Sequence, residues 1–186
     1  MDEKHADYPI NPLILNRWSP RSMTGESLSD AELMPLFEAA RWAPSAYNEQ
    51  PWRFIYAKRE TPEWEPLFNL LVDFNKGWCQ NAACLVLFIS RKTFEKNGKP
   101  SPTHKYDAGA AWMNLSLEAF DRGLVAHGMS GFDYEKARKT LKIPEDYSIL
   151  AMCALGKADL EKEKTEKPST RKPVKELLMN GFFQSV

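Results

Sequence analysis

The rest of the chain is organised around the stretch Ala43-Pro44-Ser45-Ala46-Tyr47-Asn48-Glu49-Gln50-Pro51-Trp52-Arg53-Phe54. A helical pattern runs up to this stretch and stops at Pro44, and a strand begins at Trp52. The turn between them, closed by a proline at each end, carries the polar side chains of Ser45, Asn48 and Gln50. Such a turn either simply joins a helix to a strand or holds its polar groups still for a ligand.

A second polar cluster, Arg17-Trp18-Ser19-Pro20-Arg21-Ser22, favours the ligand interpretation. Its two arginines are four residues apart and can converge on one anion, because guanidinium groups bind phosphate and carboxylate in a bidentate geometry. The alternative is a pair of solvated surface arginines. We expect this cluster and the Pro44–Phe54 turn to bind the same ligand.

The composition is that of one globular domain over residues 1–186. Hydrophobic residues make up 43% and charged residues 27% of the chain, so it can bury a core. The formal net charge of zero argues against a general attraction to nucleic acid or to anionic membranes. Six tryptophans indicate a large core, a dimer interface or a pocket for a flat ligand.

The three cysteines, Cys79, Cys84 and Cys153, have no CxxC spacing, which argues against a disulfide framework and a zinc site. The first residues contain no apolar segment of the signal-peptide type. No apolar run approaches the roughly 18 residues that a membrane-spanning helix needs. These features predict a soluble cytoplasmic protein.

The remaining pattern predicts a small sheet flanked by helices. Ser29 and Glu32 form a capping box that starts a helix ending near Trp42. The continuous apolar run over residues 82–89 predicts a central strand that is buried on both faces. Further helices are expected over residues 62–74, 105–121, 134–141 and 174–179, and further strands over residues 52–57, 124–126 and 149–155. This order predicts an α+β or α/β fold with three layers.

The segments between and beyond these elements also suggest specific structures. Residues 127–131 form a turn with glycines, where backbone can approach a flat ligand closely. Residues 91–102 form a polar loop that could cover a site, and residues 157–170 form an exposed charged linker. We expect residues 1–16 to be an irregular arm. The apolar tail that ends in Phe182-Phe183 is expected to dock on a partner subunit.

Motifs of familiar catalytic sites are absent from the sequence. It contains no GxSxG, HExxH, P-loop or GxGxxG pattern, and its three histidines share no metal-ligand spacing. No pair of carboxylates has a spacing that argues for acid–base catalysis. The polar turns without a nucleophile are typical of a protein in which a cofactor performs the chemistry.

Several motifs together resemble the nitroreductase family of FMN-dependent oxidoreductases. They occur in order along nearly the whole chain: Arg17-x-Ser19-x-Arg21, Pro44-Ser45-x-x-Asn48-x-Gln50-Pro51-Trp52-x-Phe54, the Gly109–Leu115 helix, Gly123-Leu124 leading to Ser130-Gly131, and Arg171-Lys172-Pro173. The chain departs from the family at Trp78, where some members carry a lysine, and its 127–131 turn lacks a proline.

The resemblance implies a three-layer α-β-α sandwich with a small, mostly antiparallel sheet. It also implies an obligate homodimer with FMN at the subunit interface and the C-terminal tail docked on the partner. The residues it assigns to FMN are Arg17, Trp18, Ser19, Arg21 and Arg171 from one subunit, Pro44, Ser45, Asn48 and Gln50 from the other, the Met129-Ser130-Gly131 backbone near N5, and Asn75 at the pyrimidine edge.

The activity that the resemblance implies is hydride transfer from NAD(P)H through FMN to nitroaromatic, quinone or related acceptors, in a ping-pong mechanism. A cation such as Arg21 near N1 and O2 of the flavin would stabilise the negative charge of the reduced ring. The alternatives are another flavin reaction on the same fold (dehalogenation, enal reduction or flavin destruction), a non-enzymatic flavin-binding sensor, and a dimeric structural module.

Overall fold

The computed structural model describes residues 4–183. Its strands are separated along the chain by one or two helices each. In order they are α1 (Pro12–Asn16), α2 (Asp30–Arg41), η1 (Ala46–Asn48), β1 (Trp52–Lys58), α3 (Trp64–Phe68), α4 (Asp73–Cys79), β2 (Cys84–Arg91), α5 (His104–Asp121), β3 (Leu124–Met129), α6 (Tyr134–Thr140), β4 (Tyr147–Lys157), α7 (Leu160–Glu163) and η2 (Val174–Glu176).

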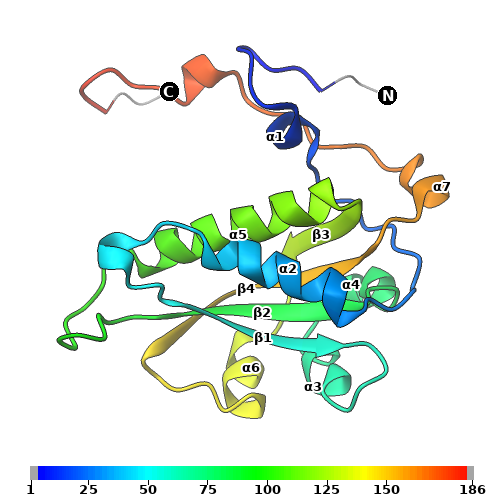
Figure 1. Cartoon of the computed structure of the whole chain (residues 1–186), viewed down its shortest axis with the longest axis horizontal. Helices are drawn as coiled ribbons and strands as arrows, with labels where there is room; N and C mark the ends of the chain where they lie inside the picture. Colours follow the sequence, from blue (N-terminus) through cyan, green and yellow to red (C-terminus); the bar gives the residue numbers. More distant parts are fainter. Residues whose placement is uncertain (1–3, 184–186) are drawn as a thin grey trace.

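One antiparallel sheet of four strands, in the order β1-β2-β4-β3, forms the middle layer. Helices α2 and α5 lie across one face of the sheet, and α3 and α6 lie on the other face (Figure 1). This arrangement confirms the predicted three-layer α-β-α sandwich with a small antiparallel sheet.

Strand β2 separates two hydrophobic cores, as its continuous apolar run predicts. Because side chains alternate along a strand, Leu85 and Leu87 face the core under α3 and α6. Val86 and Phe88 face the opposite core, under α2 and α5. All four side chains are buried, which makes β2 the most enclosed element of the fold.

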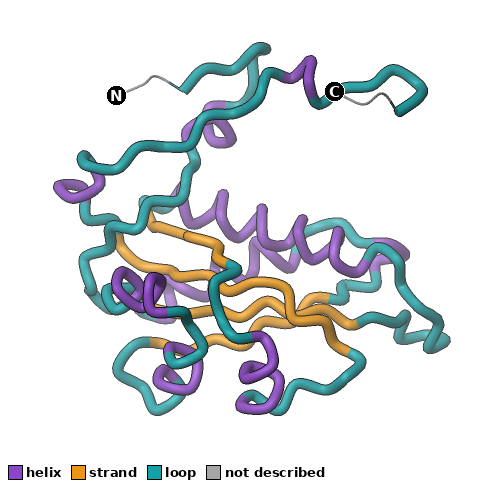
Figure 2. Tube along the Cα trace, turned by 180° about the vertical axis from the view of Figure 1, so that it is seen from behind, coloured by secondary structure: helices purple, strands orange, loops and turns teal. Residues whose placement is uncertain are grey.

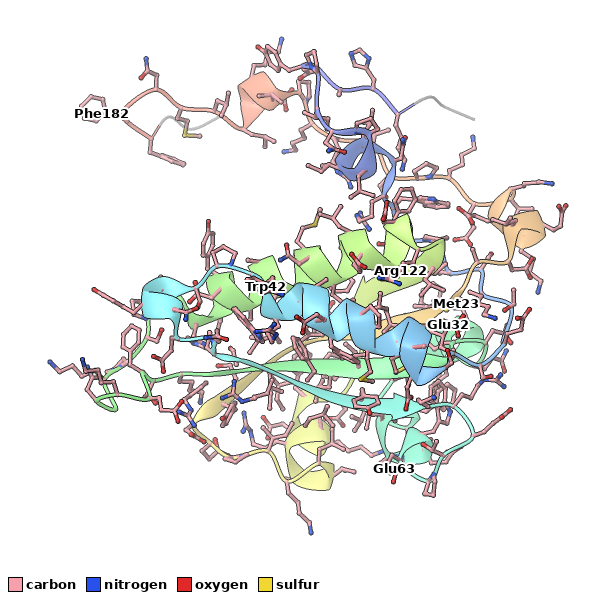
Figure 3. All side chains as sticks on the ribbon, viewed as in Figure 1. Met23, Glu32, Trp42, Glu63, Arg122 and Phe182 are labelled. Carbon is pink, nitrogen blue, oxygen red and sulfur yellow. The ribbon has the colours of Figure 1, made fainter. Side chains whose placement is uncertain are left out.

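Helix α2 begins where the capping box places it. The backbone N–H of Ser29 donates to Glu32 Oε2 at 2.8 Å, and the Ser29 hydroxyl donates to the same oxygen at 2.7 Å. Leu33, Leu36 and Ala40 are buried against the sheet and α5. Figure 3 labels Glu32 and Trp42 at the two ends of this helix, directly before the Pro44–Phe54 stretch.

The predicted helix over residues 62–74 is wrong, because the chain forms two short helices there, α3 and α4. The chain turns between them so that Leu71 can form an isolated bridge with Phe132. The N–H of Val72 donates to the Gly131 carbonyl at 3.1 Å, and the N–H of Asp133 donates to the Leu70 carbonyl at 2.9 Å. These tertiary bonds end α3 and start α4 in a new direction.

The predicted turn over residues 127–131 is also corrected, since β3 continues through Met129 and only residues 130–131 turn. His127 pairs with Ala154 and Met129 with Met152, so the neighbouring strand keeps this segment extended. The expected helix over residues 174–179 is a single 3-10 turn, η2.

Both terminal segments contain more structure than the irregular arm and the linker that the sequence predicts. Asn11 caps α1 by accepting a bond from the N–H of Leu13 at 2.8 Å. Asp159 caps α7 by accepting a bond from the N–H of Lys162 at 3.2 Å. Short polar caps therefore order segments that lack any hydrophobic periodicity.

We call residues 4–22 the N-terminal arm and residues 159–183 the C-terminal arm. They leave the body together at an isolated bridge between Met23 and Ala158, and further out the N–H of Val174 donates to Asp7 Oδ2 at 2.7 Å. The arms run side by side, away from the sheet (Figures 1 and 2). Phe182, 84% exposed, lies near the far end of the C-terminal arm (Figure 3).

None of the helices in residues 4–183 is both long enough and apolar enough to cross a membrane.

Candidate functional site

A cavity of about 630 Å³ lies between α5, the end of β3 and the middle of β4. Its volume falls in the usual range for small-molecule sites. One stripe of α5 forms a wall, with Lys105, Gly109, Trp112 and Ser116 following each other at helical spacing. The full lining is Arg17, Ser19, Phe88, Lys105, Ala108, Gly109, Trp112, Met113, Ser116, Gly128, Met129, Ser130, Ile149, Leu150, Ala151 and Met152.

Two backbone features shape this cavity. The register of β2 against β4 shifts between Phe88 and Ile89, and the residues that face this irregularity, 149–151, line the cavity. On β3, a β-carbon at Gly128 would lie 3.0 Å from the Trp112 ring. Glycine therefore lets the indole approach the strand closely, where it meets the Phe88 ring edge-on with the two ring centroids 5.6 Å apart.

Arg17 and Ser19 line the cavity where the N-terminal arm passes over it. Arg17 follows the last turn of α1, and its Nη1 donates to Ser19 Oγ at 3.2 Å. Burial lowers the pKa of Arg17, and the charge of nearby Arg171 lowers it further. Burial also lowers the pKa of Lys4, followed by the charges of Arg17 and Arg171.

The charges of Lys4 and Arg171 both act on Arg17 or are acted on by it, so the three form a cationic cluster, of which Arg17 is the member that lines the cavity. None of them takes part in an ion pair within the described part of the chain. Like charges held close together favour the binding of an anion between them.

Two other predicted residues of the N-terminal arm are held elsewhere. Trp18 Nε1 donates to Glu163 at 3.0 Å, and the Arg21 guanidinium lies 5.3 Å from the Phe74 ring centroid. The Arg21 N–H donates to Glu166 at 2.9 Å. The arm thus brings Arg17 to Arg171 and directs the Arg21 side chain toward α4.

The Ser130–Gly131 turn follows the C-terminal end of β3. Of these two residues, Ser130 lines the cavity and Gly131 does not. Asn75, which is 8% exposed, donates from Nδ2 to the Gly131 carbonyl at 3.0 Å. A β-carbon at Gly131 would lie 2.6 Å from this nitrogen, so only glycine fits. Asn75 therefore supports the turn and is not among the residues that line the cavity.

Hydrogen bonds hold the 44–50 turn in a fixed conformation. Ser45 Oγ accepts a bond from the N–H of Gln50 at 3.0 Å. Tyr47, Asn48 and Gln50 have φ values of 54°, 57° and 49°, in the left-handed region that side chains disfavour. Such strain clusters at functional sites, where the surroundings hold it in place.

Two further groups brace this turn. The buried carboxylate of Asp107, on the first turn of α5, accepts a bond from the N–H of Ala46 at 3.2 Å. In the 91–102 loop, the Phe94 ring meets Tyr47 edge-on at 5.8 Å, and the Glu95 N–H donates to Glu49. The loop that was expected to cover a site thus contacts the turn, and none of its residues lines the cavity.

One chain does not bring its two predicted halves together. The turn with Pro44, Ser45, Asn48 and Gln50 lies beside the first turn of α5, whereas α1 lies beside the C-terminal half of that helix (Figure 1). None of the residues of the turn lines the cavity.

Most of the cavity wall carries no motif in the sequence. Lys105, Trp112, Met113 and Ser116 fall within the predicted 105–121 helix, and their helical spacing on one face is the signal that could have located them. Residues 149–152 line the cavity without forming any recognisable sequence motif, because their position depends on the irregular pairing of β4 with β2. Within the described residues no group of three His, Cys, Asp or Glu could hold a metal ion.

Comparison with known proteins agrees with this geometry. The model of the Nitroreductase family matches residues 14–157, so the chain belongs to the nitroreductase family of oxidoreductases. A protein of Archaeoglobus fulgidus whose name includes NADH dehydrogenase and NAD(P)H nitroreductase is 28% identical over 156 residues, covering 81% of this chain and 86% of that protein.

Solved structures are similar over almost the whole chain. A crystal structure described as an oxidoreductase containing FMN is 36% identical, covers 98% of this chain and 97% of its own, and has a TM-score of 0.90. A nitroreductase-type protein from Desulfovibrio desulfuricans in complex with FMN is 26% identical, covers 95% and 100% of the two chains, and has a TM-score of 0.75. The family depends on FMN.

Proposed function

We propose that this protein is an FMN-dependent oxidoreductase that transfers a hydride from NAD(P)H to nitroaromatic, quinone or related acceptors in two successive half-reactions. The observation that carries the proposal is the cationic cluster of Lys4, Arg17 and Arg171, none of which forms an ion pair within residues 4–183, with Arg17 lining a cavity that also has aromatic side chains in its wall.

The donor set fits FMN. A phosphate needs several charge-assisted donors, which Arg17, Arg171 and the Ser19 hydroxyl supply at one end of the cavity. A flat aromatic ring system needs apolar walls, which Phe88 and Trp112 supply further along it. The 630 Å³ cavity has room for such a ligand.

FMN, when bound, would supply the redox chemistry of hydride transfer from NAD(P)H to the acceptor. The protein would bind the cofactor and orient it. Met129 and Ser130 line the cavity and would hold the ring from the strand side, while the apolar walls would keep water away from it. The Arg21 guanidinium lies against Phe74 and does not line the cavity, so the arginine that this chain offers to the ligand directly is Arg17. No side chain needs to act as a nucleophile.

The assembly is a homodimer in which each site is completed by the partner's copy of the 44–50 turn. Beside the cavity, α5 carries an apolar stripe that includes Tyr106, Leu117 and Phe120. Tyr106 is 83% exposed, and neither Leu117 nor Phe120 belongs to either core. A second copy of α5 would cover this stripe, and the exposed C-terminal arm would dock on the same partner.

The chain acts as a single domain, and it acts in the cytoplasm, where NAD(P)H is available.

Anaerobic spectroscopy of the purified protein tests the proposal. We expect a yellow protein whose flavin absorbance bleaches on mixing with NADH or NADPH and returns when a nitroaromatic or a quinone is added. Flavin that resists bleaching by both nicotinamides would favour the sensor alternative. A colourless protein that takes up no added FMN would refute the cofactor assignment.

A panel of acceptors then separates the reactions that this fold can host, because fold alone does not determine the acceptor. Turnover with an enal or a halogenated aromatic, and none with nitro compounds or quinones, would replace the proposed reaction by one of its alternatives.

A further inference from the structure

Helix α4 lies between the two backbone segments that border the cavity. On one side of it is the part of the N-terminal arm that carries Ser19, Pro20 and Arg21, and on the other is the Ser130–Gly131 turn. Three side chains on one side of α4 reach out to these segments. They are Phe74, Asn75 and Trp78.

The connection to the turn runs through an ordered amide. Trp78 Nε1 donates to Asn75 Oδ1 at 3.3 Å, which leaves Asn75 Nδ2 to donate to the Gly131 carbonyl at 3.0 Å. The indole N–H is a donor only, so it selects which end of the amide faces it. The same carbonyl accepts the N–H of Val72, and together the two bonds hold the turn against α4.

The connection to the arm runs through an imidazole. The Trp78 and His127 rings pack with their centroids 4.6 Å apart. His127 Nδ1 lies 3.0 Å from the carbonyl oxygen of Pro20, to which it donates a hydrogen bond as the Nδ1–H tautomer. His127 is on β3, one residue before the cavity-lining Gly128, so this bond ties the arm to the strand that carries the turn.

We propose that Trp78 is a positioning residue that couples the N-terminal arm to the Ser130–Gly131 turn, through its N–H to Asn75 and through its ring to His127. The proposal rests on the proposed function only in assigning both segments to the FMN site. Tryptophan suits this role because it combines a flat apolar face with one directional donor. A lysine at this position would supply a mobile point charge instead.

This coupling would fix the distance between the N-terminal arm and the Ser130–Gly131 turn, which are proposed to bind different parts of one ligand. Misplacing such a wall by about 1 Å can cost a large share of binding or rate, even when no contact residue changes. Trp78 does not line the cavity, so its effect must travel through Asn75 and His127.

Hydrogen exchange of the FMN-free protein tests the coupling itself. In Trp78→Phe the ring remains and the N–H is lost, so exchange should speed up around residues 130–132 and stay unchanged around residues 19–22. In Trp78→Ala both segments should exchange faster. The matched control is Trp64→Phe on α3, a buried tryptophan that stacks on Phe68 in the core remote from α5.

FMN binding supplies the second readout. Titrating the FMN-free variants with FMN by fluorescence, we expect Trp78→Phe to weaken binding by roughly 3- to 10-fold, the effect of one lost hydrogen bond. The Trp64→Phe control should bind like wild type. In an Asn75→Ala background, Trp78→Phe should have no further effect, because the bond it removes no longer has an acceptor.

The outcomes separate the two proposals. Exchange rates in Trp78→Ala that match the control would overturn the coupling, whatever FMN does. Equal effects of Trp78→Phe in both backgrounds would overturn the route through Asn75. A wild-type protein that takes up no FMN would refute the proposed function, and the exchange measurement would still decide the role of Trp78.

Discussion

At the scale of single residues, the site depends on charges that are partly buried. Arg17 is held near Arg171 and Lys4 although the three repel one another, and its pKa is lowered by burial and by that repulsion. An anion would relieve this repulsion, so the residue matters more for ligand binding than for folding.

Replacing Arg17 therefore tests the phosphate site. We expect Arg17→Ala to raise the Kd for FMN by roughly 10- to 100-fold, because a hydrogen bond to a charged group contributes about 1.5–3 kcal/mol. The thermal midpoint of the FMN-free protein should stay level or rise. Arg122→Ala, which removes an exposed arginine paired with Glu118, is the matched control. Unchanged FMN affinity in Arg17→Ala would remove that residue from the site.

His127 makes stability depend on pH. Burial lowers its pKa, the Pro20 carbonyl opposes this, Arg21 lowers it further, and Glu166 acts in the opposite direction. The unfolded chain takes up a proton near the ordinary pKa of about 6.5, whereas the folded protein does so only at lower pH. The contribution of His127 to the free energy of unfolding is therefore complete above the unfolded pKa of about 6.5, and it is lost as the pH falls toward the lower pKa of the folded protein.

Urea unfolding at pH 7 and pH 5 measures this loss. His127→Asn should lose less stability between the two values than wild type does. The pKa of His104 is lowered as well, first by burial and then by Lys105 and Lys92, so His104→Asn should remove a separate part of the fall. Identical losses in wild type and in His127→Asn would contradict the assignment.

At the scale of elements, the 44–50 turn holds a strained backbone. Gln50 and Lys142 share the left-handed conformation, with φ values of 49° and 53°. Lys142 only ends α6, where glycine is preferred. Gln50 precedes β1 in the turn that is proposed to reach the partner's FMN.

Glycine at each position separates stability from function. Lys142→Gly and Gln50→Gly should each raise the free energy of unfolding by up to about 1 kcal/mol, since the strain relieved slightly exceeds the entropic cost of glycine. Only Gln50→Gly should weaken FMN binding. Lys142→Ala, which retains a β-carbon, should show no gain. Full FMN affinity in Gln50→Gly would mean that its side chain and conformation play no part in the site.

At the scale of the whole molecule, the two predicted half-sites lie along different parts of α5 within one chain, which makes a second subunit the simplest means of joining them. We expect Leu117→Arg, on the apolar stripe of α5, to give a monomer by light scattering and to lose FMN. Lys139→Glu, on α6 across the sheet, should leave both properties unchanged. A Leu117→Arg monomer that retains FMN would contradict the shared site.

The fold was predictable where local patterns and burial agree. The apolar run of β2, the capping box of α2 and the long helix α5 each encode one structure in their own residues. The division between α3 and α4 and the extension of β3 could not be predicted. They follow from hydrogen bonds between residues 70–72 and 131–133, which no local sequence pattern records.

Residue type and spacing were enough to indicate the family, the cofactor class and the polar residues of the 17–22 and 44–50 segments. Which of those residues meet depends on the packed structure. It joined Arg17 to Arg171 and Lys4, turned Arg21 toward Phe74, and made Asn75 a support for Gly131. The reason is physical: side-chain partners far apart in the chain are chosen by how helices pack on the sheet, and packing is a property of the whole core.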